Sequence, residues 1–189
     1  MQRIVVSALL LAGLAACAAP TPAPVEQHAP SPRVVRPDPI QPPRAGNPEL
    51  PQPAILRADR PLQCVPYARQ VSGVEIYGDA WTWWGSAKGR YTRGRTPRLG
   101  AVAQLSTGPQ RGHLAVVREI VSPRRVIVDH ANWLNHGQIH RNTPMVDVSK
   151  ANDWSRVRVW YTPGDQLGSS VYPVTGFIYP ERLTAEAES

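Results

Sequence analysis

The stretch LQCVPYA (residues 62–68) opens the part of the chain that can fold around a hydrophobic core. Residues 62–74 have helical content, and Cys64 stands close to the start of this predicted helix. A thiol at a helix N-terminus is stabilised as a thiolate by the helix macrodipole and by backbone N–H groups without intrahelical partners. Cys64 is therefore a candidate nucleophile, and a buried structural cysteine is an equally common use of this residue.

A second stretch, GHLAVV (residues 112–117), leads from a glycine into a histidine and then into an apolar strand. A histidine at the mouth of a strand can face a helix N-terminus across the sheet. Pairing an imidazole with a thiol activates the sulfur as a nucleophile. We therefore predict that His113 is the base that serves Cys64.

Around these two stretches the sequence pattern changes from helical to strand-like. Residues 79–87 contain three tryptophans and predict a second, short helix with Asp79 as its N-cap. Six β-rich runs separated by turn residues follow, at residues 101–106, 113–120, 125–133, 145–148, 157–161 and 174–179. Helices followed by an antiparallel meander predict an α+β domain in which short N-terminal helices pack on one antiparallel β-sheet.

The N-terminus has the pattern of an export signal, with Arg3 before an apolar stretch at residues 4–16 that is too short for a membrane span. Residues 14–17 read LAAC, which resembles the lipobox of bacterial lipoproteins. This resemblance implies that the Cys17 thiol receives a diacylglycerol and that residues 1–17 are the signal peptide. Ala18, which is not aspartate, implies a lipid-anchored cell-envelope protein in the outer membrane, facing the periplasm. An ordinary signal peptide cleaved after Ala18 is the alternative.

Residues 18–61 contain 13 of the 21 prolines of the chain. Proline removes backbone donors and favours extended conformations, so these residues predict a semi-rigid linker. In polyproline II form it would reach on the order of 100 Å from the membrane anchor. A proline-motif ligand is the alternative to a spacer. Residues 181–189 are expected to be a flexible tail.

The formal net charge is +7 and comes almost entirely from arginine. This balance suits a polyanionic or membrane-near setting, or simply a solvated basic surface, and does not by itself indicate nucleic acid. The two cysteines, Cys17 and Cys64, could form a disulfide in a secreted domain, but each lies in a motif that uses a free thiol. The spacing of His130, His136 and His140 fits no common zinc signature, so no metal site is expected.

Together with IVDHANW at residues 127–133, the cysteine and histidine motifs resemble the CHAP domain, the cysteine-, histidine-dependent amidohydrolase/peptidase family of the papain-like and NlpC/P60 group. The resemblance covers residues 62–180. It implies a papain-like α+β fold, no cofactor, and cleavage of amide bonds in peptidoglycan by an amidase or an endopeptidase. The expected partners are thus peptidoglycan and, through the lipid anchor, a membrane.

The resemblance also implies roles for four residues. Cys64 would attack the carbonyl carbon, and His113 would carry the proton to the leaving amine. The family usually has a glutamate followed two residues later by an asparagine, and this chain has His130 and Asn132 at those positions. Strand alternation places His130 and Asn132 on one face and Asp129 on the other. We therefore predict that His130 orients His113 and that Asp129 faces away.

Two other interpretations remain open at this point. A catalytically silent CHAP-like module could bind cell wall or scaffold envelope proteins. This alternative stays open because His130 stands where the family usually has a glutamate. An acyltransferase could use the same residues, because an acyl-enzyme can pass its acyl group to an amine instead of water.

Overall fold

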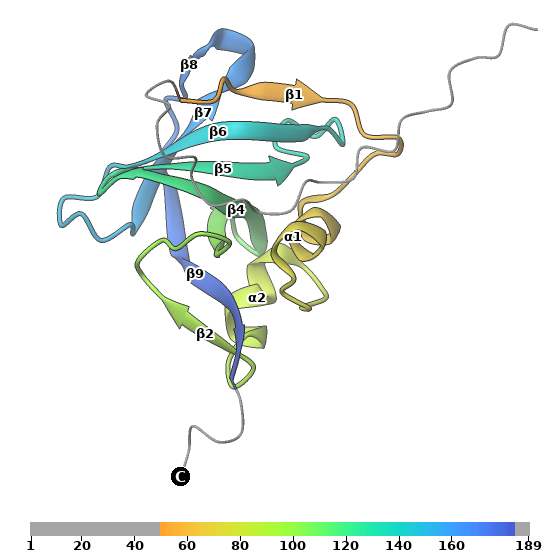
Figure 1. The fold of residues 1–189 in the computed structure, drawn as a ribbon, viewed down its shortest axis with the longest axis vertical. Helices are drawn as coiled ribbons and strands as arrows, with labels where there is room; N and C mark the ends of the chain where they lie inside the picture. The colour runs from red at the N-terminus through yellow and green to blue at the C-terminus, as the bar shows by residue number, and fades with distance from the viewer. Residues whose placement is uncertain (1–49, 184–189) are drawn as a thin grey trace, which may run out of the picture. The chain divides into compact units, whose positions relative to one another are not determined.

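The computed structural model describes residues 50–183 of the 189-residue chain. The helices of this part are α1 (Cys64–Ser72), the 3-10 helix η1 (Ala80–Thr82), α2 (Trp83–Ser86) and the 3-10 helix η2 (Thr162–Gly164). The strands are β1 (Ala54–Leu56), β2 (Tyr91–Gly94), β3 (Val102–Gly108), β4 (Arg111–Ser122), β5 (Arg125–Ala131), β6 (Ile139–Asp147), β7 (Arg156–Tyr161), β8 (Gln166–Leu167) and β9 (Tyr172–Arg182). Figure 1 shows their arrangement.

Six of the strands form a closed ring. β6, β5, β4, β3, β9 and β7 pair in this order, all antiparallel, and β7 pairs back to β6. All six strands contribute buried side chains to one continuous hydrophobic cluster, which includes Leu105, Val117, Met145 and Phe177. Because residues of every ring strand meet in this cluster, it fills the inside of the ring.

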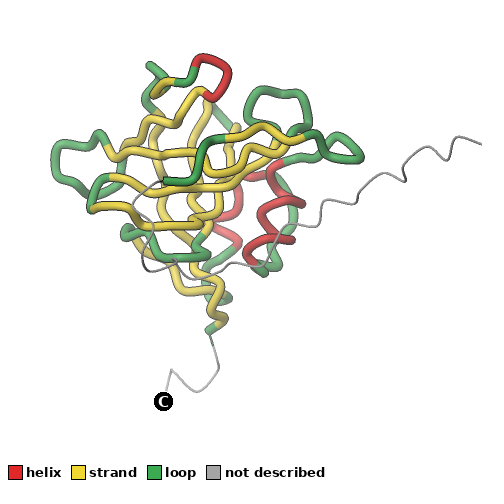
Figure 2. The backbone as a smooth tube through the Cα atoms, turned by 45° about the horizontal axis from the view of Figure 1, so that its top comes forward, coloured by secondary structure: helices red, strands yellow, loops and turns green. Residues whose placement is uncertain are grey.

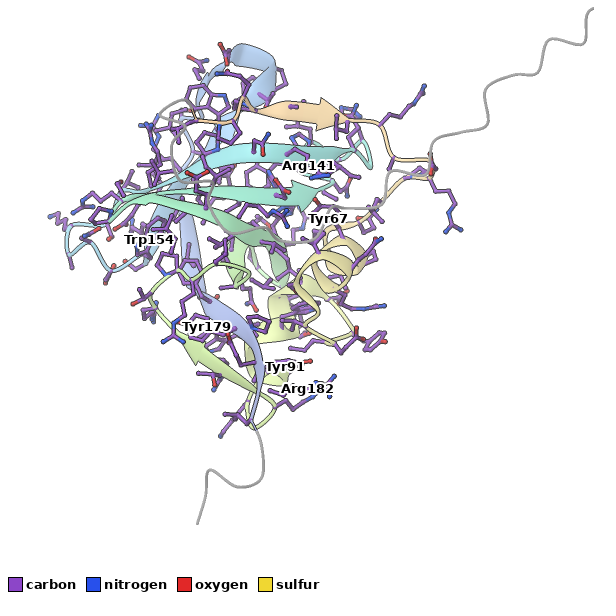
Figure 3. The ribbon with its side chains drawn as sticks, in the orientation of Figure 1. Tyr67, Tyr91, Arg141, Trp154, Tyr179 and Arg182 are labelled. Atoms are coloured by element: carbon purple, nitrogen blue, oxygen red, sulfur yellow. The ribbon has the colours of Figure 1, made fainter. Side chains whose placement is uncertain are left out.

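The helices before the sheet cover its outer face, and Figure 2 shows α1 and α2 gathered on one side of the strands. Trp83 of α2 is fully buried there in a second cluster with Leu114 and Val116 of β4 and Ile178 of β9. Tyr67 of α1 is buried against Ala131 and Ile139, and Figure 3 shows it between the helix and the sheet. The helix that begins with Cys64 is therefore held against β4 and β5 by apolar packing.

The expected order of short helices followed by an antiparallel sheet is present, but the described part is dominated by the sheet. The second helical segment is only one 3-10 turn and one α-turn, and the Asp79 side chain makes no capping hydrogen bond. The meander is also interrupted, because β9 pairs between β3 and β7. Such long-range pairing leaves no local signal in the sequence.

Several boundaries differ from those expected. β1 lies inside the range predicted as linker, because residues 54–56 pair with β6. β9 continues through Arg182, into the range predicted as tail. The predicted signal peptide, the predicted lipobox and most of the predicted linker lie outside the described residues. Among residues 50–183, no helix is long and apolar enough to cross a membrane.

Candidate active site

A cleft of about 920 Å³ lies where the start of α1 meets the start of β4. Cys64 and His113 both line it, together with Asn132 and Trp133, which directly follow β5, and Arg158 from β7. The sequence predicted that the first two would meet, and the fold brings both to one cavity. Cys64 packs against the second cluster, which contains Trp83. His113 is paired with Leu105 and lies on the side of β4 that faces the inside of the ring.

Cys64 is the first residue of α1 and is partly buried. Burial raises the pKa of its thiol, and the backbone N–H groups of Leu114, Val65 and Cys64 itself lower the pKa without offsetting that burial. The resting sulfur is therefore a thiol and not the thiolate expected from the helix N-terminus. The reason is that desolvation penalises a buried anion more strongly than these N–H groups stabilise it.

His113 is enclosed at the start of β4. Burial, and then the positive charge of His140, lower its pKa to about 3, so its imidazole is neutral near pH 7. The preceding Gly112 permits this placement, because a Cβ there would lie 2.6 Å from the backbone nitrogen of Trp81 and 2.9 Å from the carbonyl carbon of Ala80. The glycine-histidine pair in the sequence thus lets η1 pack directly on β4.

His130 lies beside His113 on the ring-facing side of the sheet. His113 Nε2 and His130 Nδ1 are 2.8 Å apart, and the other ring nitrogen of His130 lies 3.3 Å from Thr143 Oγ1. Burial, with the charges of His113 and His140, lowers the pKa of His130 well below its ordinary value. Both rings are therefore neutral at physiological pH, and one must donate its proton to the other.

One pair of tautomers is compatible with both of these hydrogen bonds. If His130 Nε2–H donates to Thr143, then His130 Nδ1 is an acceptor and receives the N–H of His113 Nε2. This arrangement leaves a lone pair on His113 Nδ1. A ring nitrogen with a free lone pair is what a general base requires.

A family model described as CHAP domain matches residues 57–132. The matched range contains Cys64, His113, His130 and Asn132 and ends at the last of them. This part of the chain is a CHAP domain. No curated protein matches the chain. The resemblance drawn from the cysteine and histidine motifs is confirmed for residues 57–132, whereas β6 to β9 lie beyond the matched range.

In this CHAP domain Asn132 holds the start of α1 and makes no described bond to His113. Its Nδ2 donates to Gln63 Oε1 at 2.6 Å, and its Oδ1 accepts the Gly137 N–H at 2.8 Å. The Gly137 carbonyl in turn accepts the Leu62 N–H at 2.9 Å. Strand alternation failed as a guide here because β5 ends at Ala131 and Asn132 has a left-handed φ of 60°. The predicted placement of Asn132 on the face of His130 therefore does not hold.

Asp129 lies on the opposite side of β5 from His130. Its carboxylate is 3.3 Å from Arg118 Nε and 3.8 Å from Arg141 Nη1, and it accepts the Asn142 N–H at 2.8 Å. The side chain is almost completely buried. Asp129 therefore belongs to a buried ion-pair network between strands, and its removal would leave two guanidinium groups without this partner.

Aromatic rings form one wall of the cleft. The Trp133 ring lies 4.7 Å from the His113 ring and 5.0 Å from the Tyr172 ring, centroid to centroid. Trp83 is a core residue instead, and Trp81 is 42% exposed. Within residues 50–183, no group of three or more His, Cys, Asp or Glu side chains is placed to hold a metal ion.

The motif analysis missed several residues of the cleft, including Gln63, Arg158 and Tyr172, and it missed Thr143 behind His130. Gln63 adjoins the nucleophile in sequence and could have been considered. The others come from β6, β7 and β9, far along the chain, and only the closed ring brings them near Cys64. Their own sequence contexts are those of ordinary strand residues.

Proposed function

We propose that this chain hydrolyses amide bonds of peptidoglycan through a covalent acyl-enzyme on Cys64, in a papain-like arrangement. One arrangement supports this proposal. Cys64, at the start of α1 in the CHAP domain, shares a cleft with His113, and His113 Nε2 lies 2.8 Å from His130 Nδ1. A nucleophile, a base and a group that orients the base are the parts that such a reaction needs.

The reaction begins from the neutral pair. As Cys64 Sγ attacks the carbonyl carbon, its proton passes to His113 Nδ1, and the carbonyl oxygen becomes an oxyanion. The backbone N–H of Cys64 is one donor for this oxyanion. The side-chain amide of Gln63, whose oxygen is already bonded to Asn132, offers a second donor in the same cleft.

The tetrahedral intermediate then collapses. The C–N bond breaks, the proton on His113 moves to the leaving amine, and a thioester joins the acyl group to Cys64. Water attacks the carbonyl carbon of this thioester and gives a proton to His113. His113 then passes this proton to the Cys64 sulfur, which leaves as the free thiol. The carboxylic acid product and the amine account for all atoms of the amide and the water.

The direct test is digestion of purified peptidoglycan followed by mass spectrometry of the soluble fragments. An amidase would release stem peptides from intact glycan strands, and an endopeptidase would release strands with cleaved cross-links. Intact peptidoglycan after prolonged incubation would favour the silent CHAP-like module. Repeating the digestion with an added primary amine would reveal an acyltransferase, because the product mass would then include that amine.

His130→Ala should lower the hydrolysis rate by about ten- to a thousandfold, because the nucleophile and the base remain but the base loses its orienting partner. His130→Glu should retain much of the activity, since a carboxylate can also accept the His113 N–H. The measurement is the initial rate of fragment release, with the fold of each variant checked by circular dichroism.

Asp129→Asn is the matched control for these variants. It stays close in shape and keeps an acceptor for the Asn142 N–H, whereas alanine would leave the partly buried Arg118 and Arg141 without this group and risk unfolding. A folded Asp129→Asn protein that has lost its activity, next to a fully active His130→Ala protein, would show that Asp129 is the residue that serves His113.

We also propose that the protein is anchored in the cell envelope by a lipid on Cys17, with peptidoglycan as its partner. Cys17→Ser should abolish metabolic labelling with a fatty acid and convert a membrane-pelleting protein into an uncleaved or soluble one, because no thiol remains to be acylated. Hydrolysis by the isolated domain should be unchanged. An unlabelled wild-type protein would indicate an ordinary signal peptide instead.

A further inference from the structure

The cleft beside Cys64 carries positive charge that no acidic side chain of its lining offsets. Arg111 and Arg158 both line it, and the described lining residues include no Asp or Glu. The remaining lining is neutral, with the polar Gln166 and Ser169 and the aromatic Tyr172 among its members. Within a concave, partly desolvated site, two uncompensated guanidinium groups attract anions more strongly than they would on an open surface.

Arg158 is held in place without being neutralised. Its Nε donates to the Gly168 carbonyl at 2.6 Å, and its Nη2 donates to the Leu167 carbonyl at 3.3 Å. Carbonyl oxygens orient the guanidinium but leave its full charge. Arg118 and Arg124, by contrast, lie 3.3 and 3.4 Å from the carboxylates of Asp129 and Asp147.

The backbone around Leu167 and Gly168, which holds the Arg158 guanidinium, is tightly packed against β7. Gly168 donates its N–H to the Val159 carbonyl at 3.0 Å, and a Cβ on Gly168 would lie 2.7 Å from that oxygen. Only glycine therefore lets β8 approach β7 closely enough to hold the guanidinium through Nε and Nη2. Among residues 50–183, Nη1 of Arg158 has no hydrogen-bond partner. Because Arg158 lines the cleft, this nitrogen is the one left to pair with a ligand there.

Arg111 adds charge at an exposed position. It is the first residue of β4, two residues before His113, and strand alternation places both side chains on one face of the strand. An exposed guanidinium at this position would attract an anionic ligand toward the nucleophile, with little desolvation of its own.

We propose that the cleft selects peptides with a free carboxylate near the scissile amide and that Arg158 pairs with this carboxylate. The inference rests on the proposed function and names its substrate class. A planar guanidinium matches a carboxylate through two parallel hydrogen bonds, and an uncharged glycan offers no such partner. Substrates in which that carboxylate is amidated should therefore bind poorly.

The test uses Cys64→Ala protein, so that binding is measured without turnover. Isothermal titration calorimetry would compare three soluble muropeptides: one with free carboxylates, one amidated at the internal glutamyl residue and one amidated at the terminus of the stem peptide. We expect amidation at one of these positions to weaken binding about ten- to a hundredfold, the range for a hydrogen-bonded charged group. The position that matters identifies the carboxylate.

Arg158→Gln in the same background should abolish the difference between the free and the amidated ligand. Arg125→Gln is the control, because it removes the same charge from an exposed residue outside the cleft lining. Arg111→Gln, at an exposed site that should tolerate the change, should weaken binding of the free form by a smaller factor. In the active enzyme, the effect of Arg158→Gln should fall on KM more than on kcat.

Equal binding of all three muropeptides by a protein that still hydrolyses peptidoglycan would overturn this inference and leave the proposed function standing. Weakening by Arg125→Gln as large as that by Arg158→Gln would also overturn it, because general charge attraction would then suffice. A protein that neither binds nor cleaves any muropeptide would overturn the proposed function and this inference with it.

Discussion

Cys64→Ala should abolish the release of soluble fragments from peptidoglycan, by at least about a thousandfold, because the proposed acyl-enzyme forms on the Cys64 sulfur that this change removes. Cys64→Ser should be nearly as inactive. His113 is a weak base, since burial lowers its pKa to about 3, and a hydroxyl is much harder to deprotonate than a thiol. The measurement is the initial rate of fragment release from purified peptidoglycan by wild type and both variants.

Both variants should keep the fold of the parent, because Cys64 is only partly buried at the start of α1. Circular dichroism provides this control. Fragment release by Cys64→Ala at the wild-type rate would rule out the acyl-enzyme mechanism. Alkylation of the wild-type thiol by iodoacetamide gives an independent measure: since burial raises the thiol pKa, the rate should be low at pH 6 and increase toward alkaline pH.

The free energy of unfolding should fall steeply as the pH drops below about 6.5. Burial lowers the pKa of His113 to about 3, that of His140 to about 4 and that of His130 well below its ordinary value. In the unfolded chain these rings take up protons near pH 6.5, whereas in the folded protein they stay neutral. Since the unfolded state binds more protons in this window, stability is full above pH 6.5 and is lost toward lower pH.

Each such proton changes the free energy of unfolding by about 1.4 kcal/mol per pH unit, so three histidines give about 4 kcal/mol per unit at most. That is a large share of the roughly 5–15 kcal/mol that stabilises an ordinary domain. Urea titrations at several pH values between 7.5 and 4.5 would measure the slope for the domain.

His140→Phe should reduce this slope by about one proton, because a ring of similar size remains packed 5.2 Å from His130 but cannot be protonated. His136, which is exposed, provides the matched control, and His136→Gln is measured in the same titrations. A free energy of unfolding that is constant between pH 6.5 and 5 would contradict this prediction, because the three rings would then take up protons in the folded state as readily as in the unfolded chain.

The local motifs predicted the central features of the site. A helix does begin at Cys64, a strand does carry His113 at its start, and the period of two along β5 correctly separated His130 from Asp129. These features depend on backbone geometry within a few residues, and that geometry is encoded by neighbouring side chains. The CHAP family could be inferred from the same short stretches.

The tertiary structure decided what depends on contacts between distant segments. The Asn132 side chain turns toward Gln63 because β5 ends one residue earlier, at Ala131. The loop after β5, which packs Gly137 on Pro61 and Leu62, sets this boundary. The protonation state of Cys64 depends on burial, which outweighs the backbone N–H groups and which no helix-start motif reveals.

The charge of the cleft has the same origin in long-range pairing. Arg158 reaches the site through the closure of the ring by β7 and through the β8 hairpin that holds its guanidinium. The sequence by itself thus determined which cysteine and which histidine are the candidates for nucleophile and base, because each lies within a local motif. The neighbours of His130, the protonation state of the Cys64 thiol and the arginine charge of the cleft were decided by the fold, because strand order and desolvation depend on residues far apart in the chain.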